Sequence, residues 1–137
     1  RFLPFQPKRE YVNVLNASDV CLLSLNKATP AETVPGKLPQ LMASGRPIIA
    51  AVPAGGYVES IILAADCGIC VPPGDFRGLR AAMLALHDDP ALAEKLGNNG
   101  RIYAKREYSR TSCTARYLEV IRAAARSSAV SGKQDVR

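Results

Sequence analysis

The sequence has 137 residues, of which 47% are hydrophobic and 22% are charged, so it is long enough for one globular domain with its own core. Eighteen Lys and Arg residues against twelve Asp and Glu residues give a net charge of +6, which favours anionic ligands without being diagnostic of nucleic acid. No run of about 18 apolar residues is present, which excludes a membrane-spanning helix. The first residues, RFLPFQPKRE, show no initiator Met and no signal-peptide pattern, and we expect the sequence to come from the interior of a longer protein.

Short apolar strands and amphipathic helices alternate through the first half of the sequence. Tyr11, Val14 and Leu15 recur at i, i+3 and i+4, which is typical of one helix face. Residues 20–23 are all apolar, as expected for a strand that helices cover on both sides. The predicted elements are a strand over 2–5, a helix over 8–17, a strand over 20–23, a helix over 38–43 and a strand over 48–52.

In the second half of the sequence, acidic residues mark the predicted starts of two helices. Asp75 can cap a helix through its carboxylate, and Asp89 repeats this device with Pro90 at the first helical position. The Gly-Asn-Asn-Gly run over 97–100 predicts a break between two helical segments. The predicted elements are a helix over 57–65, a strand over 69–71, helices over 76–86, 90–96 and 101–107, a last helix from Ser109 or Thr111 to about Arg126, and a disordered tail over 127–137.

Strands that alternate with helices predict a parallel α/β sheet with right-handed crossovers, here in one domain over residues 1–126. Ligands of such sheets bind outside the carboxyl ends of the strands. The loops after Leu23, Val52 and Val71 open on that edge. They hold the residues of unusual chemistry, which are Glu32, Gly36, Lys37, Gly55, Gly56 and Gly74.

The stretch ETVPGKLPQLMASGRP, residues 32–47, carries the strongest chemical signal. Gly36 and Lys37 lie at the start of its predicted helix, where free N–H groups and the positive end of the helix dipole favour an anion. Gly36 leaves room for close approach, and Lys37 in a first turn is unfavourable unless an anion is present. These features indicate a phosphate or diphosphate site. The alternative is a turn glycine beside a solvated lysine.

Two further polar residues, Glu32 and Gln40, flank this turn. A carboxylate and an amide suit hydroxyl-rich ligands such as sugars and ribose, because both make directional hydrogen bonds. Their spacing alone favours two exposed polar residues over a shared ligand.

The four cysteines make no convincing disulfide framework, and reduced thiols are the better interpretation. Cys67 and Cys70 form a C-x-x-C, but the second cysteine leads into a strand end rather than a helix N-terminus, which disfavours a redox role. No second C-x-x-C completes a zinc site. The only histidine, His87, has no nucleophile or partner base at a fixed spacing.

Basic residues gather in the C-terminal third, interleaved with Glu107, Glu119 and tyrosines. A solvated helix face is the favoured interpretation, and attraction to an anionic membrane surface is the alternative. The basic residues are Arg101, Lys105, Arg106, Arg110, Arg116, Arg122 and Arg126.

Several of these motifs follow one another in a familiar order. Glu32 and Gln40 occupy the places of an E-x7-E signature, and Leu-Met-Ala-Ser-Gly-Arg-Pro over 41–47 completes it. Residues 1 to about 122 therefore resemble the C-terminal domain of GT-B glycosyltransferases, in the large retaining group 1 family. The Val-Pro-Gly-Lys variant over 34–37 resembles the branch that builds bacterial surface polysaccharides.

The resemblance implies a Rossmann-like donor domain, the C-terminal half of a GT-B fold. From the resemblance we expect the first part of this domain and the N-terminal acceptor domain to be missing from the sequence. It implies that Glu32 is catalytic and contacts the donor sugar, that Gln40 replaces a ribose-binding Glu, and that Lys37 and the amides near Gly36 hold the diphosphate. The implied donor-binding residues are Gly36, Lys37, Leu38, Gln40, Gly55 and Gly56.

The implied activity is transfer of a sugar from a nucleotide-diphosphate sugar to a polysaccharide or lipid-linked acceptor. No metal motif is present, so we expect metal-independent support of the leaving group. The expected location is the cytoplasm, with peripheral contact to the inner membrane face. The chain alone is expected to be an incomplete enzyme. The alternatives are a nucleotide-sugar-binding module without turnover, a C-x-x-C thiol protein and a GT-B-fold nucleotide-sugar epimerase.

Overall fold

The computed structural model describes residues 4–131, apart from the side chains of Lys8 and of residues 127–131. The chain divides into two compact units, residues 1–105 and residues 106–137. Each unit is described by itself, and the single domain over 1–126 stays a prediction.

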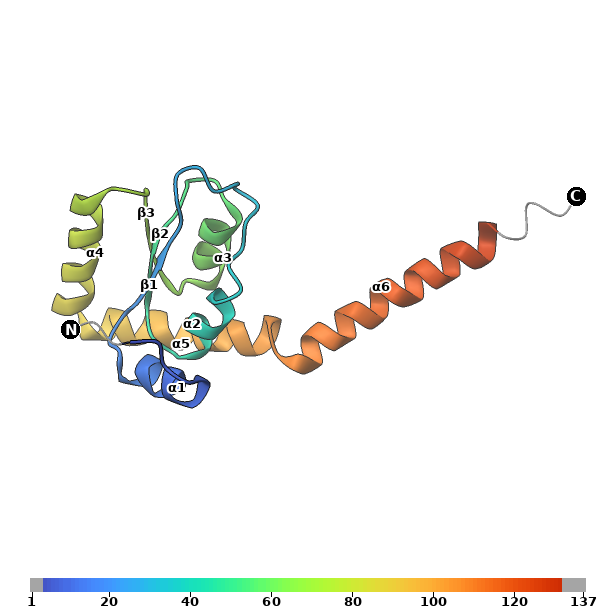
Figure 1. The fold of residues 1–137 in the computed structure, drawn as a ribbon, viewed down its shortest axis with the longest axis horizontal. Coiled ribbons are helices and arrows are strands. Elements are labelled where there is room, and N and C mark those ends of the chain that lie inside the picture. The colour runs from blue at the N-terminus through green and yellow to red at the C-terminus, as the bar shows by residue number, and fades with distance from the viewer. Residues whose placement is uncertain (1–3, 132–137) are drawn as a thin grey trace, which may run out of the picture. The chain divides into compact units, whose positions relative to one another are not determined.

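The first unit is built on a parallel three-stranded sheet in the order β1-β2-β3 (Figure 1). Its strands are β1 (Cys21–Ser24), β2 (Ile48–Ala51) and β3 (Gly68–Val71). The register pairs Leu22 with Ile49 and Ile49 with Ile69, so these three residues lie on one face of the sheet. The parallel α/β architecture predicted from the alternating pattern is confirmed.

Helices flank the sheet on both sides, with α2 and α3 on one side and α4 on the other (Figure 1). Three helices, α1, α2 and α3, have the bounds that the sequence predicted. The bounds of the helices are α1 Lys8–Ala17, α2 Leu38–Ala43, α3 Tyr57–Ala65, α4 Phe76–Asp88, α5 Pro90–Glu107 and α6 Arg110–Ser131.

One side of the sheet, which we call the α2–α3 face, is closed. Apolar side chains from the strands and from both helices are buried there, each stabilising the fold by about 1.5–3 kcal/mol relative to exposure. They are Leu23, Leu38, Met42, Ile48, Val58 and Ile62.

The other side, the α4 face, is covered over only part of its width. Ile49, Ala51 and Val71 pack with Ala82, Leu86 and Leu96 in one apolar cluster. Because α4 packs on β2 and β3, the apolar residue that β1 contributes to this face, Leu22, stays 48% exposed.

The glycines of α5 are packing positions and not a helix break. The break predicted over 97–100 is wrong, since α5 is continuous from Pro90 to Glu107. Gly97 and Gly100 are buried, and a Cβ atom on Gly97 would collide with the carbonyl of Gly45. Only glycine lets the helix approach the residues that precede β2 so closely.

Two predicted caps are confirmed. The Asp75 carboxylate accepts a hydrogen bond from the N–H of Gly78 at 2.9 Å, and that of Asp89 accepts one from Leu92 at 2.9 Å. After α2, Gly45 adopts a left-handed φ of +73°, as expected for a glycine that ends a helix.

The ends of the chain differ from the prediction. Residues 4–7 form no strand, and the rest of the predicted strand over 2–5 lies outside the described residues. The last helix, α6, continues past the predicted end at Arg126 to Ser131, and the disorder of the tail stays a prediction. Residues 132–137 of the predicted tail lie outside the described residues.

The second unit consists of α6 and the residues that lead into it. Ser109 caps the helix by accepting the N–H of Ser112 at 3.2 Å. Glu107 accepts from Arg106 at 2.7 Å and also binds Arg116. The hydrogen bond from Arg106, with the charge of Arg116, lowers the pKa of Glu107. None of the described helices is long and apolar enough to span a bilayer.

Candidate donor-binding site

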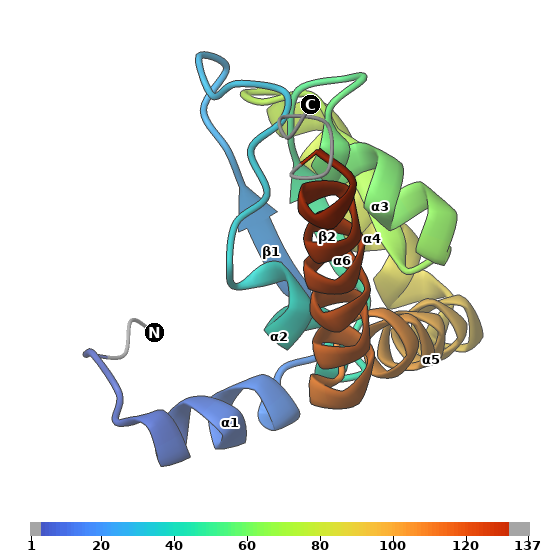
Figure 2. The same ribbon diagram turned by 90° about the vertical axis from the view of Figure 1, so that its right-hand side faces the viewer.

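Three loops meet at the carboxyl edge of the sheet, as the topology predicts. The loop after β1 is tied to the end of β2 by a hydrogen bond of 2.9 Å from the N–H of Leu25 to the carbonyl of Ala51. Its middle is tied to the start of α3, where the N–H of Tyr57 donates to the carbonyl of Ala31 at 2.8 Å. Figure 2 shows β1 at the outer edge of the sheet, with this loop rising from its end.

Glu32, the predicted catalytic residue, directly follows this second tie. Its side chain is exposed. Because Ala31 is held against the first residue of α3, the backbone of Glu32 lies beside the Gly55-Gly56 turn. Gly56 is buried under the same loop, and a Cβ atom there would lie 3.1 Å from the carbonyl oxygen of Ala31. The structure therefore brings Glu32 and these two glycines together.

The turn over Gly36 and Lys37 leads into α2, but the helix start offers no free donors. The N–H of Leu38 donates to Pro35 at 3.0 Å, Pro39 has no N–H, and the N–H of Gln40 donates to Lys37 at 3.0 Å. The prediction of free N–H groups at this helix start is therefore wrong. A helix of six residues also carries little dipole.

What remains for an anion at this turn are the amides of Gly36 and Lys37 themselves and the Lys37 ammonium group. In the described part of the chain, neither amide donates to a backbone carbonyl. Both residues are exposed, and no atom lies within 4 Å of the position that a Cβ on Gly36 would take. The open space that the sequence predicted around Gly36 is present.

The two predicted ligand residues of α2 differ from each other. Gln40 is exposed and can reach a ligand. Leu38 is fully buried and its amide is bonded to Pro35, so this residue is corrected from a donor-binding residue to a core residue.

The glycine turn before α3 already holds a carboxylate. The N–H of Gly55 donates to the carboxylate of Glu59 at 2.6 Å, and Gly55 has a φ of +73°. An anion that used this amide would have to displace Glu59. Sequence reasoning missed Glu59, which the i+4 spacing from Gly55 into the first turn of α3 could have indicated.

A second residue that sequence reasoning missed is Lys27. It lies in the loop after β1, and its Cε atom is 3.8 Å from the position that a Cβ on Gly74 would take. This contact joins the loops after β1 and β3. Lys27 therefore adds an exposed positive charge to the edge that holds Lys37. Its place early in the loop that follows β1 is the signal that could have found it.

The C-x-x-C motif is not reactive. Cys67 is fully buried, and burial, followed by the charges of Cys70 and Asp66, raises its pKa to about 12. Burial also raises the pKa of Cys70 to about 11, with Glu59 adding to the shift. Both thiols stay protonated near neutral pH, which argues against thiolate chemistry.

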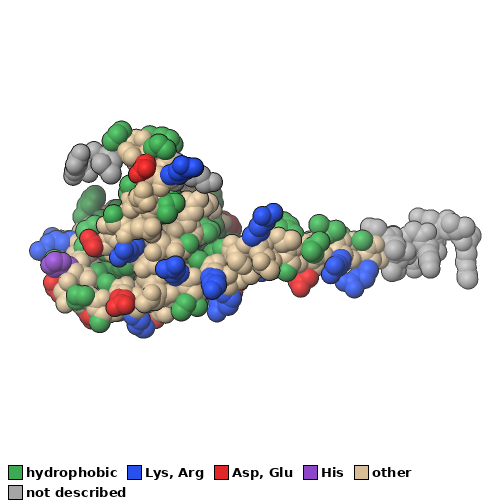
Figure 3. All heavy atoms as spheres, turned by 90° about the horizontal axis from the view of Figure 1, so that it is seen from below, with side chains coloured by type: hydrophobic (Ala, Val, Ile, Leu, Met, Phe, Trp, Pro, Cys, Tyr) green, Lys and Arg blue, Asp and Glu red, His purple; other side chains and the backbone are tan. Residues whose placement is uncertain are grey.

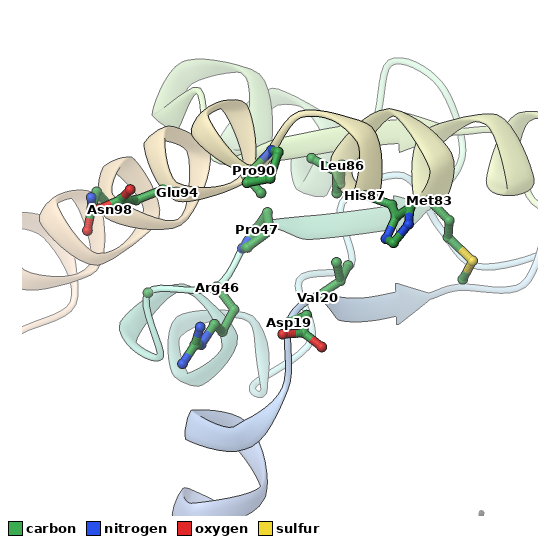
Figure 4. Close-up of a pocket in the computed structure, with 12 residues that line it drawn as sticks. Asp19, Val20, Arg46, Pro47, Met83, Leu86, His87, Pro90, Glu94 and Asn98 are labelled. Atoms are coloured by element: carbon green, nitrogen blue, oxygen red, sulfur yellow. The ribbon is translucent and has the colours of Figure 1, made fainter.

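A hollow of about 650 Å³ lies at the opposite edge of the sheet (Figure 4). Val20 and Pro47, which directly precede β1 and β2, line it together with His87. Beside it, Arg46 donates to the carbonyl of Asn16 at 2.6 Å. His87 is exposed, as its purple imidazole in Figure 3 shows. None of the predicted donor-binding residues lines this hollow.

Within the described residues, no group of three or more His, Cys, Asp and Glu side chains could hold a metal ion. The expectation of metal-independent chemistry stays a prediction.

Comparison with models of protein families shows which family the chain belongs to. Residues 1–103 match the family model of glycosyl transferases group 1. The chain belongs to this family. The matched range covers the whole sheet and all three loops of its carboxyl edge. A comparison with curated proteins gives no match.

Two solved structures show the same arrangement. Sucrose-phosphate synthase from Thermosynechococcus elongatus matches with a TM-score of 0.71 and 27% identity, over 89% of this chain. Anabaena HepE in complex with UDP matches with a TM-score of 0.67 over 80% of this chain, and its 17% identity shows the fold alone. The chain spans 29% of the length of each. Its α/β sheet thus matches part of a GT-B fold.

Proposed function

We propose that this chain is the donor-binding part of a retaining glycosyltransferase. The complete protein would transfer a sugar from a nucleotide-diphosphate sugar to a polysaccharide or lipid-linked acceptor. The family match over residues 1–103 carries the proposal, because it covers the carboxyl-edge loops that hold the candidate residues. The structure of HepE holds UDP, a ligand of the proposed class.

The proposed roles follow from what each residue exposes at this edge. The Glu32 carboxylate would contact the donor sugar, and the Gln40 amide would bind the ribose hydroxyl groups. The Lys37 ammonium group and the amides of Gly36 and Lys37 would bind the diphosphate, and Lys27 would add charge to the same edge. Such fixed positive groups would stabilise the leaving nucleoside diphosphate.

The Gly55-Gly56 turn would shape the floor of the site. Gly56 lets the loop that carries Glu32 lie against α3, because a side chain there would meet the carbonyl oxygens of Ala31 at 3.1 Å and of Pro53 at 3.2 Å. Its role is therefore to position Glu32 and not to bind the donor directly.

A direct test measures UDP and uridine binding to the Lys37→Ala chain by calorimetry, with Lys105→Ala as the matched control. Lys37→Ala should weaken UDP binding about tenfold and leave uridine binding nearly unchanged, since only UDP carries the diphosphate. Lys105→Ala should change neither, although it removes the same charge. Equal losses for UDP and uridine would place Lys37 away from the phosphates. Retention of binding in EDTA would support metal-independent binding.

A second candidate, a binding module without turnover, is favoured by one observation. The chain spans 29% of each of the two solved structures that it matches, so groups that bind the acceptor would come from elsewhere. Sugar transfer from a UDP sugar to water or to added acceptors should then be absent for this chain and present for the complete protein. Robust transfer by the chain alone would contradict this.

The location and the acceptor partner belong to the same proposal. A cytoplasmic enzyme that uses a lipid-linked acceptor would work near the inner membrane face. The exposed side chains of Arg110, Arg122 and Arg126 on α6 could contribute attraction to anionic lipids. Co-sedimentation of the chain with phosphatidylserine vesicles, and loss of that binding in high salt, would support it. Equal sedimentation with neutral vesicles would contradict it.

A further inference from the structure

Tyr57, the first residue of α3, is held beside the loop that carries Glu32. Its N–H group donates to the carbonyl of Ala31 at 2.8 Å, and Glu32 is the next residue in the chain. The backbone of Tyr57 therefore lies next to that of the predicted catalytic residue, although the two are distant in the sequence.

Side chains of α3 fix the turn that leads into Tyr57. The N–H of Gly55 donates to the Glu59 carboxylate at 2.6 Å, and the Ser60 hydroxyl group donates to the carbonyl of Gly56 at 3.2 Å. The backbone of Tyr57 is thus held both by the loop after β1 and by its own helix. A ligand that contacts Tyr57 meets an ordered residue, so little conformational entropy is lost there on binding.

The aromatic ring of Tyr57 is not part of the core. The buried residues of α3 are Val58, Ile62 and Ala65. The side chain of Tyr57 is 58% exposed. Cα–Cβ bonds in a helix tilt toward its N-terminus, and α3 begins at the carboxyl edge of the sheet because it follows β2. The bond that carries the ring is therefore directed toward the loops of that edge.

A sugar is the ligand whose surface matches a carboxylate next to an aromatic ring. Hydroxyl groups at the rim of a sugar ring donate hydrogen bonds to a carboxylate such as that of Glu32. The C–H groups on the faces of the sugar form an apolar surface that can pack on an aromatic face. A phosphate group has no apolar surface, and the negative face of an aromatic ring disfavours an anion. The pair therefore fits the sugar of a donor better than its diphosphate.

We propose that Tyr57 is the platform on which the donor sugar packs, with the Glu32 carboxylate at the rim of the same sugar. The inference rests on the proposed function, which assigns Glu32 to the donor sugar. Tyr57 is then a specificity residue, because the shape of the sugar face decides how well it packs on the ring. It has no part in binding the diphosphate.

Calorimetry of the complete protein with UDP, UDP-glucose and UDP-N-acetylglucosamine tests the proposal. Tyr57→Ala should weaken binding of the UDP-sugars about five- to tenfold and binding of UDP by less than about twofold, since UDP lacks the sugar. Equal losses for UDP and the UDP-sugars would place the ring on the nucleotide, or show a general loss of structure, and would overturn the proposal. Unchanged binding of all three would overturn it as well.

Two further variants separate the aromatic ring from other roles. Tyr57→Phe keeps the aromatic face and should retain the wild-type affinity for the UDP-sugars within about twofold. Phe76→Ala is the matched control, because Phe76 is 80% exposed and begins α4 at the same edge, but its N–H donates to Gly74 of its own loop. It should leave all three affinities nearly unchanged.

The controls also separate this inference from the proposed function. A loss on Phe76→Ala as large as that on Tyr57→Ala would overturn the assignment to Tyr57. Normal binding of UDP without an effect of Tyr57→Ala on the UDP-sugars would contradict the platform alone. Absence of UDP binding to the wild-type protein would contradict the proposed function and the platform with it.

Discussion

Helices cover the two faces of the small sheet to different degrees. On the α2–α3 face, both helices come from connections between adjacent strands, so each crosses the sheet where the next strand begins, and the apolar side chains are buried. On the α4 face, α4 and the first turns of α5, which both follow β3, pack on β2 and β3 and leave Leu22 exposed. The cover of a strand is therefore decided by which connections pass over it and not by how apolar it is.

The two faces should differ most in the loss of stability that a larger side chain causes. Gly68 pairs with Ile48 on the α2–α3 face, and a Cβ atom there would collide with the carbonyl of Ile48. Gly68→Ala should cost about 3 kcal/mol of unfolding free energy or more, because backbone must move. Leu22→Phe, on the α4 face, should change it by less than about 0.5 kcal/mol. Urea denaturation of both variants measures this, and similar costs would show that the α4 face is closed too.

The chain's two methionines give a matched deletion on the two faces. Met42 is 0% exposed and Met83 is 46% exposed. Met42→Ala should lose about 3 kcal/mol through lost burial and a residual cavity, whereas Met83→Ala should lose less than about 1 kcal/mol. Denaturant midpoints of the two variants provide the comparison. A Met83→Ala cost as large as that of Met42→Ala would contradict the uneven cover.

The buried thiol next to the closed face makes stability depend on pH. Burial raises the pKa of Cys67 to about 12, above the ordinary value of 9.0, so the native state favours the protonated thiol. Its contribution is complete below pH 9 and is lost as the pH rises towards 12. The melting temperature should fall over this range, and the fall should be smaller in Cys67→Ala. An unchanged pH slope in that variant would remove Cys67 as the cause.

The smallest effect is expected in the second unit. The Glu107 carboxylate binds Arg106 and Arg116 at the surface. Its pKa is lowered, so its stabilising contribution is present above pH 4.5 and is lost as the pH falls below that value. Glu107→Gln should reduce the helical circular dichroism signal slightly at neutral pH and leave the urea midpoint of the sheet unchanged. A shift of that midpoint would show that the two units unfold together.

Local patterns predicted the parts of the fold that local interactions decide. The apolar spacing of helices such as α3 and the carboxylate caps Asp75 and Asp89 depend on residues a few positions apart, and all are found where predicted. The run over 97–100 shows the limit. Its glycines are typical of a break, but contact with Gly45, distant in the sequence, keeps the helix continuous.

The site was predictable to a similar extent. The loops that hold Glu32, Lys37 and the glycines each follow a strand, as the alternation of elements implied. The sequence could not predict which backbone N–H groups are already hydrogen-bonded, because this depends on turns such as the one that joins Leu38 to Pro35. The burial of Leu38 and the contact of Lys27 with Gly74 arise only when separate loops come together.

The hydrogen bond between Ala31 and Tyr57 has a consequence for how this loop can evolve. It joins two backbone groups, so almost any side chain can occupy position 31 or 57 without loss of the bond. Gly56 has no such freedom, because a side chain there would push against the carbonyl of Ala31. Selection can therefore vary the side chains around Glu32, while one glycine keeps the backbone of this loop against the start of α3.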